Sequence, residues 1–309
     1  MQQRTVSFIG LGGVASGSDF LYTYITAHSE VCVLQRPTNF FIDVHRYQRG
    51  LDWYEMHWQH CKAGKQHGEC AMLYLAHAEA AERIARSYPQ AKLLAVVCNP
   101  IDRVYYEYRR AQEQGTVTKQ VTLARYIELH PEALTRGLFG QHLQTYFDLY
   151  SPLQLYVAVH EDRYDDPIAY VQNVYRFLEL THVDFVPRPL RRFVQVDEDE
   201  HHPHRPWWWR LGYRLVAPIR WLRLDVVTRL LWRRLIRPYW PAKWRLHWQT
   251  HKQVATIPRP EAVPIDPELR QLLVEYYAGD VYRLSLLLHR DLNAEWDIPR
   301  TQSTADKAH

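Results

Sequence analysis

The chain has 309 residues, and its 38 Lys and Arg against 34 Asp and Glu give a formal net charge of +4, which does not by itself indicate a nucleic-acid partner. Its 4 cysteines are too few for a disulfide framework at this length, so a reducing, cytoplasmic setting is expected. The first residues lack the long apolar run of a secretory signal, and no stretch approaches about 18 uncharged apolar residues, so no transmembrane helix is expected.

The first predicted elements surround a glycine-rich turn. A short apolar strand at residues 6–9 ends in the small residues of 10–18, and residues 20–25 have the apolar spacing of a helix. In this order, backbone N–H groups and a helix N-terminus can bind phosphate or sulfate. The turn has neither the GxGxxG spacing nor the lysine of a GK[ST] motif. Two interpretations stay open, an anion-binding loop and a tight turn without a ligand.

The following segments alternate between strands and helices. A strand is expected at residues 30–34, an aromatic-rich helical lid at 43–58, a polar connector at 60–68 and an amphipathic helix at 73–88. Five histidines and cysteines in this part match no named zinc pattern, so no metal site is expected. They are His57, His60, Cys61, His67 and Cys70.

Two apolar runs predict core strands. Residues 92–98 are continuously apolar, which is typical of a strand buried on both faces, and residues 155–159 form a second such run. Helices are expected at residues 101–114, 122–130, 140–150 and from Pro167 to about 180. The alternation predicts a three-layer α/β domain with a parallel central sheet and helices on both faces.

Residues 188–260 differ in kind and are predicted to be an insert within one domain that spans residues 1–309. Eight of the eleven tryptophans lie at 207–248, and twelve Lys or Arg stand against one acid between Arg205 and Lys252. A cationic helix with tryptophan on its apolar face is typical of a membrane interface. A surface helix packed on the domain and a site for an acidic polysaccharide stay open as alternatives, whereas nucleic acid is not expected.

The last part of the chain returns to an ordinary pattern. Residues 266–296 predict an amphipathic helix followed by the ending HRDLNAEW. Residues 300–309 are expected to be a disordered tail.

Six of these pieces, taken in order, resemble motifs of the sulfotransferase superfamily, in particular its bacterial and heparan-type branch. The first is the glycine-rich loop, which resembles the family's 5′-phosphosulfate loop. The others are Phe40-Phe41 with residues 49–54, Gly68-Glu69 with Tyr74-Leu75, residues 92–108, residues 156–167 with Glu161-Asp162, and residues 267–296. The resemblance covers most of the chain and implies the sulfotransferase fold.

The resemblance also implies an activity and a cofactor. The family transfers a sulfuryl group from 3′-phosphoadenosine 5′-phosphosulfate to a hydroxyl or amine and requires no metal. Its loop lysine and backbone amides hold the 5′-phosphosulfate, a carboxylate or histidine deprotonates the acceptor, and an arginine and a serine hold the 3′-phosphate.

Residue by residue, the positions that carry charge in the family are replaced here. The loop lysine falls on Ala15, the usual base on Pro37 and the GEKSP lysine on Cys70, while the arginine and serine of the 3′-phosphate site fall on Cys98 and Tyr106. The positions that pack or turn are retained. They are Gly12, Gly17, Phe40, Phe41, Trp53, Tyr54, Pro100, Arg103, Tyr108, Glu161, Asp162 and Pro167.

The sequence therefore predicts a sulfotransferase fold whose donor site has been lost or rebuilt. The Glu161-Asp162 turn is interpreted as structural, and for Arg103 a structural role is favoured over a ligand role, which stays open. The expected donor-binding positions are Gly12, Gly13, Val14, Ala15, Ser16, Gly17, Ser18, Cys98, Arg103 and Tyr106. Possible substitutes for the lost groups are Ser16, Ser18, Arg36 and Arg205, and possible bases are His45, Asp43 and Glu55.

Two functions stay open on these grounds. The first is a divergent sulfotransferase that acts on a carbohydrate or lipid-linked hydroxyl. The second is a catalytically inactive member of the family that serves as a binding or scaffolding module at a membrane surface. In either case, peripheral attachment through residues 207–248 to the inner face of a membrane is an option.

Overall fold

The computed structural model describes residues 6–34, 36–71, 73–184, 194–195, 253–254, 259 and 262–300. It divides into two compact units, one formed by Met1–Pro187 with Thr256–His309 and the other by Arg188–Ala255. In the second unit the structure describes an antiparallel pair, β6 (Val194–Gln195) and β7 (Gln253–Val254).

Several sequence predictions fall outside the described residues. The tryptophan-rich segment 207–248 and the tail at 301–309 both belong to this group. Within the described part of the chain, no helix combines the length and the apolar character needed to cross a bilayer.

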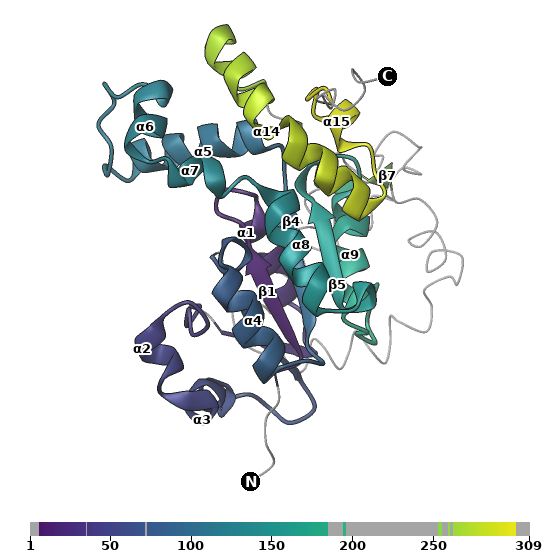
Figure 1. Cartoon of the computed structure of the whole chain (residues 1–309). Helices are drawn as coiled ribbons and strands as arrows, with labels where there is room; N and C mark the ends of the chain where they lie inside the picture. Colours follow the sequence, from purple (N-terminus) through teal and green to yellow (C-terminus); the bar gives the residue numbers. More distant parts are fainter. Residues whose placement is uncertain are drawn as a thin grey trace, which may run out of the picture. The chain divides into compact units, whose positions relative to one another are not determined.

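The first unit is built on a five-stranded, fully parallel sheet with strand order β2-β3-β1-β4-β5 (Figure 1). Its strands are β1 (Phe8–Gly12), β2 (Val31–Val33), β3 (Gln66–Cys70), β4 (Lys92–Val97) and β5 (Leu155–Val159). Every residue of the central strand β1 is buried, and so is every residue of β4 after Lys92. This arrangement confirms the predicted α/β class.

Helices cover both faces of the sheet, as predicted. On one face α1 (Ser18–Thr26) packs against α9 (Pro167–Phe177), and on the other α4 (Ala78–Ser87) packs against α8 (Phe139–Leu149) (Figure 1). The long helix α14 (Pro267–Leu288) lies on α8. The apolar core lies between the sheet and the α4–α8–α14 layer, and β4 contributes Leu93, Ala95 and Val97 to it.

Shorter elements surround this core. The α-helices are α2 (Val44–Tyr47), α3 (Gly50–Glu55), α5 (Pro100–Glu113), α6 (Leu123–Leu129), α7 (Glu132–Thr135) and α15 (Leu292–Glu295). The 3₁₀ helices are η1 (Met56–Trp58), η2 (Tyr74–Ala76), η3 (Pro152–Gln154) and η4 (His160–Tyr164).

Helix starts follow the capping residues that the sequence contains. The Asn99 side chain accepts a hydrogen bond from the N–H of Ile101, and Pro100 occupies the first turn of α5, where its missing N–H costs nothing. The Asp166 carboxylate accepts from the first amides of α9 in the same way. These caps set the directions in which α5 and α9 leave the carboxyl ends of β4 and β5.

Strand β3 corrects the sequence prediction of a polar connector at residues 60–68. Its Glu69 carboxylate is fully buried and accepts hydrogen bonds from the N–H and hydroxyl of Thr38 and from the hydroxyls of Tyr54 and Tyr74. A buried carboxylate is tolerated where several donors surround it. These donors come from distant segments, so the sequence of β3 alone does not show that its polar residues can be buried in a strand of the sheet.

Two boundaries also differ from the prediction. β1 continues through Gly10 and Leu11 to Gly12 instead of ending at residue 9, because parallel pairing with β4 extends to that residue. α4 begins at Ala78, since the 3₁₀ turn η2 takes up residues 74–76 first.

Candidate functional site

The loop between β1 and α1 is a backbone cradle. Ser16 closes it on itself, because both its N–H and its hydroxyl donate to the carbonyl of Gly13, at 3.1 and 2.8 Å. Ala15 and Gly17 have φ values of 57° and 77°, in the left-handed region. The loop thus turns sharply before α1 begins, and Ser16 uses its hydroxyl proton within the loop.

Several donors at the end of this loop have no acceptor among the described residues. Ser18 is fully buried, and its Oγ has no hydrogen-bond partner. Gly17, the N-cap of α1, offers no side chain to the first turn, and the N–H groups of Gly17, Ser18 and Asp19 are likewise without described acceptors. A hydroxyl and three amides at the positive end of a helix fit a phosphate or sulfate oxygen.

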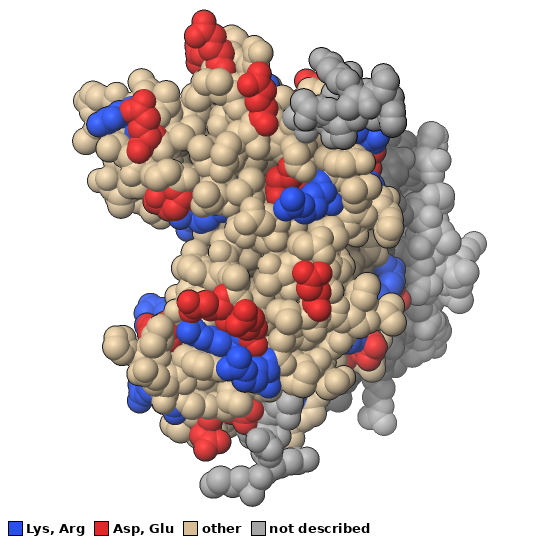
Figure 2. All heavy atoms as spheres, viewed as in Figure 1, with Lys and Arg blue, Asp and Glu red and all other residues tan. Residues whose placement is uncertain are grey.

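The surface is hollowed beside this loop. Figure 2 shows the hollow at the left, between the part that carries α5, α6 and α7 and the part that carries α2, α3 and α4. In Figure 1, which has the same view, the loop that joins β1 to α1 is drawn between these two groups of helices. The position agrees with the rule that ligands of open parallel sheets bind at the carboxyl ends of the strands.

His160 packs directly on the loop. It begins η4 at the end of β5, and a Cβ placed on Gly17 would lie 1.8 Å from its ring atoms. Burial, together with the charge of Arg163, lowers the pKa of His160 to about 3, so the imidazole is neutral at physiological pH. Its Nδ1 is buried without a partner.

Arg103 contacts the loop through a hydrogen bond to its backbone. Its side chain is fully buried, pairs with Glu107 at 2.6 Å, and donates to the carbonyl of Ala133 and, at 3.4 Å, to that of Val14. These contacts spread over α5, α7 and the loop. They support the interpretation of Arg103 as a structural residue.

Cys98 and Tyr106 lie at the end of β4 and on α5. Cys98 is buried, and Tyr106 is 39% exposed. Arg163 lies on η4, which follows β5, and β5 pairs with β4, so Arg163 and Cys98 follow neighbouring strand ends. Arg163 was not among the predicted site residues. The only feature of the sequence that could have indicated it is its position one 3₁₀ turn after the second core strand.

The expected catalytic bases have other contacts. The Asp43 carboxylate caps α2 by accepting from the N–H of Arg46, and it pairs with the same guanidinium at 3.1 Å. Glu55 accepts from the hydroxyl of Tyr88 at 3.0 Å. His45, also on α2, makes no hydrogen bond or ion pair with any described residue.

Of the two proposed replacement arginines, the structure describes only Arg36. Arg36 is exposed and forms no described ion pair, and Arg205 lies outside the described residues. The structure therefore joins Ser18 and His160 at the cradle.

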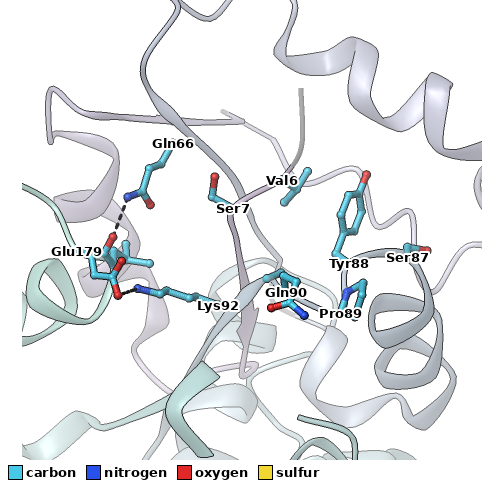
Figure 3. Close-up of a pocket in the computed structure, with 11 residues that line it drawn as sticks. Val6, Ser7, Gln66, Ser87, Tyr88, Pro89, Gln90, Lys92 and Glu179 are labelled. Carbon is cyan, nitrogen blue, oxygen red and sulfur yellow. Dashed lines mark hydrogen bonds and ion pairs between the residues drawn. The ribbon is translucent and has the colours of Figure 1, made fainter. Parts of the chain in front are cut away.

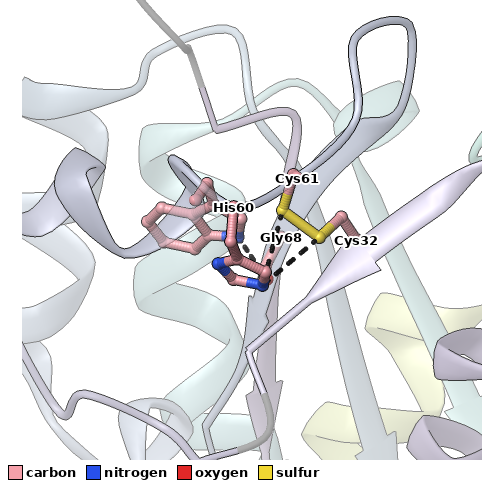
Figure 4. Close-up of a disulfide and its surroundings, with 5 residues drawn as sticks. Cys32, His60, Cys61 and Gly68 are labelled. Carbon is pink, nitrogen blue, oxygen red and sulfur yellow. Dashed lines mark hydrogen bonds between the residues drawn. A yellow bond between two sulfur atoms is a disulfide. The ribbon is translucent and has the colours of Figure 1, made fainter.

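A disulfide joins Cys32 of β2 to Cys61, which follows η1 (Figure 4). This pair departs from the expectation of free cysteines, and Cys70 and Cys98 remain as thiols. The His60 Nε2 lies 3.9 Å from both sulfur atoms. Of the five residues considered for zinc, His60 and Cys61 come together with Cys32, but a disulfide sulfur is not the thiolate that zinc binds.

A cleft of about 420 Å³ lies at the opposite ends of the strands (Figure 3). Its lining includes Val6 and Ser7 before β1, and Lys92, whose Nζ pairs with Glu179 at 2.9 Å. Because these residues precede β1 and begin β4, the cleft is remote from the glycine-rich loop. None of the expected site residues lines it.

Comparison with known proteins yields one family. Residues 14–194 match the family model described as a sulfotransferase domain. Human bifunctional heparan sulfate N-deacetylase/N-sulfotransferase 3 is 24% identical over 196 residues, which are 57% of this chain and 22% of that protein. Human heparan sulfate glucosamine 3-O-sulfotransferase 6 is 28% identical over 180 residues, which are 56% of this chain and 52% of that protein.

The chain thus spans about half, or less, of the length of these curated relatives. A solved structure extends the likeness to nearly the whole fold. The crystal structure of a sulfotransferase from Alicyclobacillus acidocaldarius superposes with a TM-score of 0.63 at 19% identity, covering 95% of this chain and 99% of that one.

Proposed function

The chain belongs to the sulfotransferase family, and from this premise we propose that its glycine-rich loop binds the 5′-phosphosulfate of 3′-phosphoadenosine 5′-phosphosulfate. When bound, that donor supplies the sulfuryl group, and the acceptor is a hydroxyl of a carbohydrate or of a lipid-linked molecule. The names of the heparan sulfate relatives support a carbohydrate acceptor.

One observation carries the donor-binding part of this proposal. Ser18 is fully buried, its hydroxyl has no described partner, and it sits where α1 presents its first amides. A buried hydroxyl without a partner costs free energy, and an oxygen of a bound ligand would accept its hydrogen bond and remove that cost. Gly17, the neutral imidazole of His160 and the Ser16 turn keep the cradle in shape around it.

Calorimetric titration with adenosine 3′,5′-bisphosphate, the desulfated donor, tests the proposal. We expect saturable binding by the wild-type chain and a loss of about tenfold to a hundredfold in affinity for Ser18→Ala, because one hydrogen bond to a charged oxygen is removed. Thr23→Ala, on the exposed side of the same helix, is the matched control. If the wild-type chain shows no binding at high micromolar nucleotide, the proposal fails.

A second candidate, a donor-binding protein without transfer, is supported by the state of the possible bases. Asp43 and Glu55 are engaged elsewhere, and His160 has a pKa of about 3, which makes it a weak base at neutral pH. Removing one transition-state donor costs about two to three orders of magnitude in rate, and the loop lysine is absent at Ala15. Transfer of labelled sulfate to any acceptor would exclude this candidate.

We further propose that residues 207–248 attach the protein to a membrane surface, on the grounds of their tryptophan-rich, basic sequence alone. Flotation with liposomes that contain anionic lipid measures it. The double variant Trp221→Ala with Trp232→Ala is expected to lose flotation, and unchanged flotation would contradict the proposal.

A further inference from the structure

The side chains of His160 and Arg163 on the 3₁₀ turn η4 face the first turn of α1. The β4–β5 register pairs Val97 with Val159, so the residues that follow, Cys98 and His160, leave neighbouring strand ends. Side chains three residues apart in a 3₁₀ helix lie on the same face, which brings Arg163 into line with His160.

Both members of this pair contact α1. The His160 ring lies against Gly17, and the Arg163 guanidinium carbon lies 5.2 Å from the centre of the Phe20 ring, three residues further along. One face of η4 is therefore packed along the turn that holds the unpartnered Ser18 hydroxyl.

Arg163 keeps unused hydrogen-bond donors. Its Nη2 donates to the hydroxyl of Tyr164 at 2.8 Å, while its Nε is buried and has no partner. It forms no ion pair with a described residue, in contrast to Arg103, which is paired with Glu107. A guanidinium that is partly buried beside an anion cradle, without a carboxylate, is suited to bind a phosphate group.

The surroundings of Arg163 fix its place in the site. β4 ends just before Cys98 and pairs with β5, which leads into η4, so Cys98 and Arg163 follow neighbouring strands at the same edge of the sheet. Burial raises the pKa of Cys98 and of Tyr106, and the positive charge of Arg163 is among the influences that oppose each rise, after that of Arg103 at Cys98. These two positions correspond, in the sequence resemblance, to the arginine and serine that hold the donor's 3′-phosphate. Arg163 supplies a cation on the 3₁₀ turn that follows β5, the strand adjacent to β4.

We propose that Arg163 binds the 3′-phosphate of the nucleotide donor, in place of the arginine that Cys98 has replaced. The inference rests on the proposed function, because it assigns a residue to the same donor site. It makes Arg163 the residue that discriminates a 3′-phosphorylated nucleotide from one without that phosphate.

The test compares adenosine 3′,5′-bisphosphate with adenosine 5′-phosphate by calorimetry. For the wild-type chain we expect tighter binding of the bisphosphate. Arg163→Gln is expected to lower the affinity for the bisphosphate by about tenfold to a hundredfold and to leave that for the monophosphate within about threefold, so that the two affinities converge. Arg163→Lys keeps the positive charge but loses the paired N–H donors of the guanidinium. Its affinity for the bisphosphate is expected to lie between those of the wild type and Arg163→Gln.

Arg176→Gln is the matched control, because Arg176 lies at the far end of α9 and bonds Asn173. Equal losses for both nucleotides in Arg163→Gln and Arg163→Lys would assign Arg163 a structural role and overturn the inference. An affinity of Arg163→Gln for the bisphosphate that equals that of the wild type would also overturn the inference. In either of these results the wild-type chain still binds nucleotide and the proposed function stands, whereas binding of neither nucleotide by the wild-type chain overturns both.

Discussion

Gly17 occupies a position that combines an unusual backbone angle with a crowded neighbour. Its φ of 77° disfavours any side chain, and the His160 ring fills the space where a Cβ would lie. We expect Gly17→Ala to lower the free energy of unfolding by about 2–4 kcal/mol, from backbone strain and overpacking together. Urea denaturation measures the change.

Gly64→Ala separates the two causes. Gly64 has a φ of 80° but nothing within 4 Å of its Cβ position, so it carries the backbone cost alone, about 1 kcal/mol. Equal losses at the two glycines would show that His160 does not pack on the loop.

His160 gives the stability of the protein a pH dependence. Its pKa is about 3 in the folded chain and near 6.5 when unfolded, so below pH 6.5 the unfolded state binds the proton more readily. The free energy of unfolding then falls by about 1.4 kcal/mol per pH unit between pH 6.5 and 3. The buried carboxyls of Glu161 and Asp102 have raised pKa values and act in the opposite sense.

The difference between the wild type and His160→Gln isolates this contribution. We expect the difference in stability between the two proteins to be constant above pH 7. As the pH falls below 6.5, the wild type should lose stability relative to His160→Gln. Thermal unfolding across pH 4–8 measures it, and two parallel curves would contradict the assignment.

Ala15 is the position where the loop can regain a cation. It already has a positive φ without being glycine, and it is partly exposed, so a longer side chain adds little strain there. Ala15→Lys is expected to raise the affinity for adenosine 3′,5′-bisphosphate by about tenfold, with Ala15→Gln as the uncharged control. No gain would show that the cradle is not aligned with a nucleotide phosphate.

Among the elements, the lid segment between β2 and η1 is the one held by a covalent bond. The Cys32–Cys61 disulfide joins residues 29 apart and encloses α2 and α3. A cross-link of this length is expected to stabilise the fold by about 3–4 kcal/mol. The double variant Cys32→Ala with Cys61→Ala should unfold at lower denaturant than the wild type by this amount.

A thiol reductant provides the control for that experiment. It should destabilise the wild type and leave the double variant unchanged. Titration of the unfolded, non-reduced chain should find two free thiols, Cys70 and Cys98, and a count of four would contradict the disulfide.

The elements also show how far sequence patterns reach. Apolar runs and capping residues predict β4, β5, α5 and α9, because each depends on local chemistry. They do not predict β3, whose Glu69 is satisfied by residues from other segments. Nor do they predict the disulfide or the place of Arg163, since both depend on contacts that form only when distant strands are aligned.

At the scale of the molecule, the carboxyl-terminal segment is joined to the candidate site. Arg290, beyond α14, makes two hydrogen bonds of 2.8 and 2.7 Å to the Asp162 carboxylate of η4, and it also pairs with Glu295. Asn99 reaches the same segment through the carbonyl of Trp296. The turn that carries His160 and Arg163 is therefore joined to the carboxyl-terminal segment through Asp162 and Arg290.

Arg290→Gln tests this connection. Because the pair is partly exposed, we expect a loss of only about 1 kcal/mol in the free energy of unfolding. We also expect weaker binding of adenosine 3′,5′-bisphosphate, because η4 loses its support. Arg300→Gln, which removes an exposed pair with Asp291, is the control, and equal nucleotide affinities in the two variants would contradict the connection.

The central place of β1 has a consequence for synthesis of the chain. Phe8 pairs with Gly68 on one side and with Lys92 on the other, so β1 leaves the ribosome well before either of its partner strands. At about 5–20 residues per second, several seconds pass before β4 follows. During that interval the apolar edges of β1 are open to other nascent chains, and we expect co-translational chaperone binding at this strand to determine the yield of folded protein.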